Sequence, residues 1–342
     1  MTPTVGIVVV NYNGLADTRE CLRSLSAVNH ARWFPVVVDN ASREDPTATI
    51  TSEFPGCTVI RRAVNGGWAG GNNAGIRWCL QHHADYVVLL NNDTRVSPRL
   101  IERLLAAAEA HPGHGILGPV IRHFDPPCDV QTEGCDFNTP RRAEFFQRRA
   151  VSLHDLPSPA VTDVDIVNGC CMMVGAQVFR KIRLIDEQFF LIHEESDFCL
   201  RARKAGFRCG VMGETLVWHK GSQSFRRAGL RVQRYYDARN LLRLLSKHGY
   251  LPGHRRGRLA SLWHYLKYVY ARYETERDAG QIDSATAVLE GAADAVLRRF
   301  GPYRPGLRPG LSLFRAIFDC RRLSVRRPRF SAAAVAPVGA PS

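Results

Sequence analysis

The sequence predicts an α/β fold built on a doubly wound, mostly parallel sheet, followed by a basic helical extension at the C-terminal end. Two observations support this prediction. Short runs rich in Val and Ile are apolar at nearly every position, as in central parallel strands that are buried on both faces. These runs alternate with segments whose apolar residues recur at helical spacing. In such a sheet the loops at the carboxyl ends of the strands form the binding site.

Strands and helices alternate through roughly the first third of the chain. The strand runs lack a regular polar alternation, and they cover residues 5–10, 36–38, 58–60 and 86–90. The helical segments between them cover residues 18–26, 72–81 and 98–110. In the first of these helices Cys21, Leu22 and Leu25 fall on one face, and in the last Leu100 and Leu104 do.

The pattern changes twice further along the chain. Residues 113–159 are rich in Pro, Cys and charged residues, which predicts an irregular excursion between core elements. Structured patterns return in DIVNGCCMMVGAQVFRKI, EESDFCLRARKAGF and CGVMGETLVWHKG, and after about Lys220 the chain becomes basic and helical. The predicted units are a main domain at residues 1–225 with halves of about 1–112 and 113–225, a basic helical region at 226–330, and a disordered tail at 331–342.

The net charge predicts an anionic partner. The chain has 46 Lys and Arg against 32 Asp and Glu, which gives a formal charge of +14 and a pI near 9.7. Nucleic acid, acidic lipid and a phosphorylated small molecule all satisfy this charge. Nucleic acid is not expected, because the sequence shows no base-stacking or helix-in-groove module.

The ends and the cysteines predict a cytoplasmic protein. No basic segment precedes the first apolar run, so no signal peptide is expected, and no apolar stretch approaches the roughly 18 residues that span a bilayer. The ten cysteines include no CxxC pair of the kind that zinc sites use. We expect them to be reduced, buried thiols.

Carboxylates follow two of the predicted strands directly. Asp39 suits two roles, accepting an N–H of a pyrimidine base or forming the turn DNAS, and the sequence does not separate them. Asp93 ends the stretch LLNND and suits Mg²⁺ or Mn²⁺, which takes one or two carboxylates when it is joined to a diphosphate. Its alternative role is to cap the next helix, but Ser97 is the better-placed N-cap. We therefore favour metal binding for Asp93.

A glycine-dense stretch, NGGWAGGNNAG, runs from Asn65 to Gly75. It is neither a GxGxxG fingerprint after the first strand nor a GxxxxGK[ST] phosphate loop. Its glycines permit close approach of the backbone to a ligand, and Asn72 and Asn73 add donors at a helix start.

A second group of acidic residues opens an amphipathic segment. Glu194, Glu195 and Asp197 suit the positive end of a helix dipole, and a carboxylate left over at a cleft edge suits a general base. His219 ends the strand-like run VWH, where it is either a metal ligand or a half-buried histidine.

Taken together, the motifs resemble the family 2 glycosyltransferases of the GT-A fold, and within them bacterial rhamnosyltransferase-type enzymes are most similar. The resemblance covers about residues 4–250. It is carried by seven stretches in order: VVVNYNG, VVVDNAS, NGGWAGGNNAG, LLNNDT, NGCCMMV, EESDFCLR and WHKGSQS.

The resemblance implies a nucleotide-diphosphate sugar donor and a Mg²⁺ or Mn²⁺ ion, with a donor half and an acceptor half in the main domain. Asp93 would bind the metal with help from His219. The implied donor-binding residues are Val10, Asn11, Asn13, Asp39, Asn65, Gly71, Asn72, Asn91 and Asn92. The implied catalytic residues are Glu195 as general base, with Glu194 and Asp197 beside it.

Three positions depart from the family pattern. Glu195 stands where the aspartate of an ED pair is usual, and Asn91 stands where a full DxD motif has aspartate. Trp68 replaces a more common Phe. The resemblance implies an inverting transfer, in which Glu195 takes the proton of the acceptor hydroxyl as it attacks the anomeric carbon.

The acceptor is not determined by the sequence. Members of the family often act on lipid-linked sugars at the cytoplasmic face of the membrane, and a soluble natural-product scaffold is the alternative. The segment LASLWHYLKYVYARY could lie on an anionic membrane, although packing of its apolar stripe on the catalytic domain or on a second subunit is the preferred interpretation. A sugar nucleotidylyltransferase would need a basic glycine-rich loop near the first strand, which is absent. Rhamnose is expected as the transferred sugar only because the motifs resemble those of rhamnosyltransferase-type enzymes.

Overall fold

A computed structural model describes residues 2–126, 128–137, 146–147, 160–221, 230–249 and 255–306, together with 308, 311 and 315–316. The side chains of the helix that begins at Arg255 are described from residue 262 onward. The tail predicted at 331–342 lies outside the described residues, as does part of the excursion predicted at 113–159.

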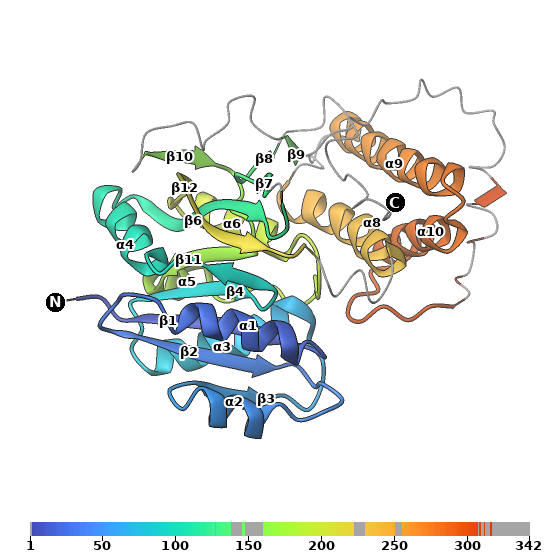
Figure 1. The fold of residues 1–342 in the computed structure, drawn as a ribbon. Helices are drawn as coiled ribbons and strands as arrows, with labels where there is room; N and C mark the ends of the chain where they lie inside the picture. The colour runs from blue at the N-terminus through green and yellow to red at the C-terminus, as the bar shows by residue number, and fades with distance from the viewer. Residues whose placement is uncertain are drawn as a thin grey trace.

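The described elements alternate between strand and helix in the first half and become helical near the end (Figure 1). The strands are β1 (Val5–Asn11), β2 (Trp33–Asp39), β3 (Thr58–Arg61), β4 (Tyr86–Asn91), β5 (Thr94–Val96), β6 (His114–His123), β7 (Val130–Thr132), β8 (Asp136–Phe137), β9 (Phe146–Gln147), β10 (Val161–Val164), β11 (Cys171–Gly175) and β12 (Arg208–His219). The helices are α1 (Leu15–Leu25), α2 (Thr47–Glu53), α3 (Gly67–Gln81), α4 (Leu100–Ala110), α5 (Ala176–Ile182), α6 (Glu194–Lys204), α8 (Leu230–Lys247), α9 (Arg255–Asp278) and α10 (Ile282–Val296).

One central sheet has the strand order β10-β12-β6-β11-β4-β1-β2-β3. Strands β3, β2, β1 and β4 are parallel, as the uniformly apolar runs predict. The Val and Ile side chains of β2 and β4 are buried, as are those of β1 apart from Val10, whereas those of β3 are half-buried. Antiparallel pairing enters with β11, which pairs with β4 on one side and β6 on the other. Strand β12 is again parallel to β6. The sheet is therefore mixed, with four neighbouring parallel strands from the N-terminal part of the chain.

Strand β6 lies in the middle of the sheet, where the sequence predicted an irregular excursion. That prediction was wrong for residues 114–123, which form the strand HGILGPVIRH. Gly115, Gly118 and Pro119 interrupt the apolar pattern that would have indicated a strand. Pro119 lies beside a register shift in the pairing of β6 with β12, and the pairing of β11 with β6 reaches only Ile116 and Leu117.

Helix α3 begins at Gly67, five residues before the predicted start. Most of the glycine-dense stretch is therefore helix rather than loop. A Cβ atom at Gly71 would overlap the side chain of Val10, and one at Gly75 would overlap that of Val8. The glycines thus let α3 lie directly on β1.

Two other helix starts differ from the predictions. Helix α1 begins at Leu15 rather than residue 18, and α4 begins at Leu100 with Arg99 as its N-cap residue. Ser97 is therefore not the N-cap, although its Oγ accepts a hydrogen bond from the Arg99 N–H at 3.3 Å. The short helix α2 was not predicted, because only Ile50 within it is buried.

The C-terminal helices α8, α9 and α10 lie beside the sheet, on the side toward which β2 points (Figure 1). Helix α9 buries Tyr265, Val269 and Tyr273, so this part of its apolar stripe packs on the protein, which was the preferred interpretation. Leu262 and Trp263 are exposed. Within the residues that the structure describes, no helix combines the length and apolarity needed to cross a membrane.

Candidate active site

The parallel strands bring four predicted site residues together at their carboxyl ends. Asn11 pairs in register with Asp39, and Val10 pairs with Asn91. These residues end neighbouring strands, so their positions follow from the parallel register. Asn92 and Asp93 continue from the end of β4.

Asp39 is fully buried and is held by its neighbours. Asn11 Nδ2 donates to Asp39 Oδ1 at 2.9 Å, and the Ser42 N–H donates to Oδ2 at 3.3 Å. Arg61 Nε lies 3.8 Å from the same Oδ2. The Ser42 contact is a turn contact, so the turn-forming role expected as one alternative is present.

Ser42 is a site residue that the sequence analysis missed. Its Oγ accepts hydrogen bonds from the Asn13 N–H at 2.8 Å and from Asn11 Nδ2 at 3.1 Å. Asn13 has a φ of 52°, and its Oδ1 accepts a hydrogen bond from the Arg43 N–H. The turns after β1 and β2 are therefore joined to each other. The signal for Ser42 was its place in DNAS beside Asp39.

Asn40, also missed, joins the end of β2 to the start of α3. Its Nδ2 donates to Asn65 Oδ1 and to the Gly67 carbonyl, both at 2.9 Å. Its Oδ1 accepts from the Gly66 N–H at 3.1 Å. Asn72 is buried within α3 and donates to the Trp68 carbonyl. Of the predicted donor residues, Asn65 and Gly71 therefore lie where α3 meets the strand ends, whereas Asn72 bonds within α3.

Asn91 connects three elements. Its Oδ1 accepts a hydrogen bond from Trp68 Nε1 at 3.1 Å, and its Nδ2 lies 3.4 Å from His219 Nε2. The next residue, Asn92, donates to Thr18 Oγ1 at 3.0 Å. These amides fix the end of β4 between α1, α3 and β12.

Asp93 and His219 lie side by side. Asp93 Oδ1 is 3.0 Å from His219 Nε2, and both side chains are buried. The pairing of β5 with β12 sets this contact, since His219 is in register with Thr94. His219 Nδ1 lies 2.8 Å from Gln131 Oε1. When Nδ1–H of the neutral ring donates to Gln131, Nε2 carries no hydrogen, and its lone pair faces Asp93.

The residues at this point fit a hard divalent cation. A carboxylate oxygen and an imidazole nitrogen face each other at one sheet edge, and phosphate oxygens would complete the coordination. The described residues contain no group of three or more His, Cys, Asp and Glu side chains that could hold a metal by themselves. The arrangement therefore suits a metal that arrives with a diphosphate.

Glu195 lies across Gly169 from Trp68. A Cβ atom at Gly169 would be 3.1 Å from the Trp68 ring and 3.4 Å from Glu195 Cβ. Since Trp68 also bonds Asn91, the candidate base is close to the end of β4. A larger residue than glycine at 169 would separate them.

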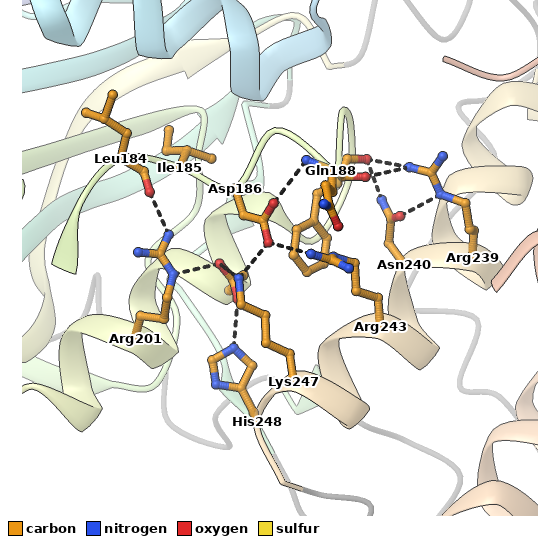
Figure 2. A network of polar contacts seen from close by, with 12 residues as sticks. Leu184, Ile185, Asp186, Gln188, Arg201, Arg239, Asn240, Arg243, Lys247 and His248 are labelled. Atoms are coloured by element: carbon orange, nitrogen blue, oxygen red, sulfur yellow. Dashed lines mark hydrogen bonds and ion pairs between the residues drawn. The ribbon is translucent and has the colours of Figure 1, made fainter. Parts of the chain in front are cut away.

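Glu194 and Asp197 have different surroundings from Glu195. Burial, followed by the charge of Glu195, raises the pKa of Glu194 well above its ordinary value, and its Oε2 has no hydrogen-bond partner among the described residues. Asp197 accepts hydrogen bonds from Arg201, Lys247 and His248. Although burial opposes ionisation, the His248 hydrogen bond and the nearby cations hold the Asp197 pKa well below its usual range. Its carboxylate thus joins α6 to the end of α8. Figure 2 shows its partners Arg201, Lys247 and His248 close together.

A cavity of about 190 Å³ opens beside Glu195. Its apolar lining comes from Cys135, Phe146, Ile166 and Ile192, and its polar lining comes from Thr132, Asn168, His193, Glu195 and Ser196. None of the amide residues at the ends of β1, β2 and β4 lines this cavity, and the cavity is open to solvent. The site thus has a polar part at Asp39, Asn91 and Asp93 and an apolar part reached by Glu195.

Such a mixed sheet, with a carboxylate at a strand end and a second carboxylate beside a cavity, is the arrangement of a GT-A glycosyltransferase. Sequence profiles match Glycosyl transferase family 2 over residues 6–158 and Glycosyl transferase family group 2 over residues 86–281. The second match covers more than half of the chain, and the chain belongs to the family 2 glycosyltransferases.

Three curated relatives are similar over most of their lengths. The low-salt glycan biosynthesis hexosyltransferase Agl10 of Haloferax volcanii is 28% identical over 70% of this chain and 75% of its own. The dTDP-rhamnosyl transferase RfbF of Shigella flexneri is 25% identical over 72% and 81%. The N-acetylglucosaminyl-diphospho-decaprenol L-rhamnosyltransferase of Mycobacterium tuberculosis is 24% identical over 66% and 78%. The chain is therefore similar to rhamnosyltransferases within the family.

Solved structures support the fold. TarS of S. aureus aligns with a TM-score of 0.56 at 15% identity, over 92% of this chain and 53% of TarS. GalNAc-T7, solved with UDP, GalNAc and Mn²⁺, aligns with a TM-score of 0.54 at 12% identity, over 74% of this chain and 56% of its own. The chain thus spans about half the length of these two proteins, and the likeness concerns the GT-A fold alone.

Proposed function

We propose that this protein is a metal-dependent, inverting hexosyltransferase that uses a nucleoside-diphosphate sugar, with dTDP-rhamnose as the first candidate donor. The observation that carries the proposal is the contact chain from Asn91 through Trp68 and Gly169 to Glu195. It is consistent with a general base next to the strand end that receives the diphosphate. The names of two relatives support rhamnose as the sugar.

Each part of the site has a task in this proposal. Residues 1–112 form the donor half, with the base and ribose near Asp39, and residues 113–225 form the acceptor half. Asp93 and His219 would hold Mg²⁺ or Mn²⁺, which when bound neutralises charge on the diphosphate. The solved neighbour GalNAc-T7 contained Mn²⁺, which agrees with this choice.

Glu195 carries out the proton transfer. Its carboxylate takes the proton of an acceptor hydroxyl, whose oxygen forms a bond to the anomeric carbon. The bond from that carbon to the diphosphate oxygen breaks, and its electron pair leaves with the diphosphate. Asp197 is assigned to structure rather than catalysis, since three side chains engage its carboxylate.

The acceptor is proposed to be a saccharide, lipid-linked in the first instance. The mycobacterial relative is named for a lipid-linked acceptor, N-acetylglucosaminyl-diphospho-decaprenol. A soluble natural-product scaffold is the alternative acceptor. The net charge of +14 and the exposed Leu262 and Trp263 of α9 support a cytoplasmic protein at the inner face of an anionic membrane.

Turnover of dTDP-rhamnose tests the proposal. We expect wild-type protein with Mn²⁺ to release dTDP slowly by hydrolysis and faster with a saccharide acceptor. Glu195→Gln should lower transfer by at least about a hundredfold, because general base catalysis contributes about 10²–10⁴. Glu109→Gln, an exposed glutamate on α4, is the matched control. Wild-type activity in Glu195→Gln would show that Glu195 is not the general base.

A further inference from the structure

His193 precedes the two glutamates and lies in the same cavity as Glu195. Its side chain lines the cavity, and its ring stacks on Phe146 with centroids 4.9 Å apart. His193 is the N-cap residue of α6 and has a φ of 70°, a conformation that few side chains adopt without support. Its side chain is 9% exposed. The histidine is therefore held in one orientation.

Helices α8 and α9 provide that support. His193 Nε2 lies 3.1 Å from Asp237 Oδ1, and Tyr268 Oη donates to Asp237 Oδ2 at 2.5 Å. Arg272 Nε lies 3.8 Å from Oδ2. Burial alone would raise the pKa of Asp237, but the His193 hydrogen bond and the nearby positive charges lower it to about 2.

The ionised carboxylate fixes which nitrogen carries the hydrogen. A carboxylate can only accept, so Nε2 must donate to Asp237. In the neutral imidazole Nδ1 is then a hydrogen-bond acceptor. Nδ1 has no hydrogen-bond partner in the part of the chain that the structure describes. A buried and oriented histidine thus presents an acceptor nitrogen in the lining of the cavity that Glu195 also lines.

We propose that His193 is an acceptor-positioning residue, whose Nδ1 receives a hydrogen bond from a second hydroxyl of the acceptor while Glu195 receives the proton of the reacting hydroxyl. This inference rests on the proposed function and narrows the acceptor to a saccharide unit with neighbouring hydroxyls. An isolated alcohol would satisfy Glu195 and leave Nδ1 without a partner. Asp237, Tyr268 and Arg272 act through His193, so the C-terminal helices take part in acceptor recognition.

Two substitutions separate this role from a purely structural one. In His193→Gln the side-chain amide reaches the position of Nε2 and can still donate to Asp237, but nothing replaces Nδ1. In His193→Asn the side-chain oxygen replaces Nδ1, and the contact with Asp237 is lost. His83 is exposed, has a φ of 57°, and serves as the matched control for both substitutions.

The experiment uses full-length protein, dTDP-rhamnose, Mn²⁺ and a panel of octyl glycosides of N-acetylglucosamine, rhamnose, galactose and mannose. Hydrolysis of the donor without acceptor is measured alongside transfer. We expect His193→Gln to raise the acceptor KM about three- to tenfold, which is the loss of one neutral hydrogen bond, with donor hydrolysis and Tm like those of His83→Gln. His193→Asn should recover part of the acceptor KM.

Three results would overturn the inference. An acceptor KM within twofold of wild type in His193→Gln would show that Nδ1 does not receive a hydrogen bond from the acceptor. Equal losses in hydrolysis and transfer, together with a lower Tm, would show a structural role only. Retained donor hydrolysis without transfer to any glycoside would reject a saccharide in this cavity while leaving the donor reaction in place. Absence of donor hydrolysis and of dTDP binding would instead contradict the proposed function itself.

Discussion

Arg239 Nη2 donates a hydrogen bond to the Phe189 carbonyl at 2.7 Å, across 50 positions of the sequence. Arg239 is fully buried on α8, and its guanidinium lies 4.7 Å from the centre of the Tyr236 ring. Its neighbour Asn240 bonds the same carbonyl (Figure 2). Helix α8 therefore fixes the loop that leads into Glu194 and Glu195.

Asn240→Leu should destabilise the protein by about 2–4 kcal/mol. Asn240 Nδ2 bonds the carbonyls of Phe189, Leu191 and Ile192. Leucine would leave the partly buried Leu191 and Ile192 carbonyls without this donor, whereas the Phe189 carbonyl keeps its bond from Arg239. Denaturant unfolding measures the change. The same substitution at exposed Asn29 is the control and should cost less than about 0.5 kcal/mol. Equal effects at the two sites would show that α8 does not anchor this loop.

Gly75→Ala should destabilise the protein by about 1–3 kcal/mol, although alanine favours helices. The added Cβ would overlap the buried side chain of Val8 and push α3 away from β1. Gly56→Ala is the matched control, because nothing lies within 4 Å of a Cβ at that position. A thermal melt compares the two variants. A rise in Tm for Gly75→Ala would contradict the close packing of α3 on β1.

Glu194→Gln should become more stabilising as the pH rises. The folded protein raises the pKa of Glu194 above the ordinary 4.5, so the unfolded chain ionises first above that pH and wild-type stability falls. Glutamine does not ionise. The Tm difference between Glu194→Gln and wild type should therefore be small near pH 4 and grow toward pH 7.

Melting curves at pH 4, 5, 6 and 7 measure this difference, with Glu109→Gln as the exposed control. A Tm difference that is constant with pH would show that Glu194 titrates alike in the folded and unfolded chain.

The parallel half of the fold could be predicted because its strands are buried on both faces and therefore read as apolar runs. The same rule placed Asp39 and Asp93, since each directly follows such a run. Strand β6 was missed because its glycines and proline resemble a loop, and the start of α3 was missed because glycine disfavours helices in isolation. Packing of Gly71 and Gly75 on β1 explains why the helix extends through them.

The rest of the site depends on contacts between distant segments. Gln131 contacts His219 across 88 positions, and His193 contacts Asp237 across 44. Neither Gln131 nor Asp237 stands in a local pattern that marks it. The role of α8 was equally hidden, because a buried Arg239 and an exposed arginine look the same in a basic sequence.

Calorimetric titration of dTDP into wild-type protein and Asp93→Asn, with and without Mn²⁺, tests the central claim most directly. If Asp93 holds a metal that is joined to the donor diphosphate, wild-type binding should tighten with Mn²⁺. Asp93→Asn should weaken that binding by about ten- to hundredfold, while Asp278→Asn at an exposed position should not. Equal affinity in Asp93→Asn and wild type in the presence of Mn²⁺ would contradict the account.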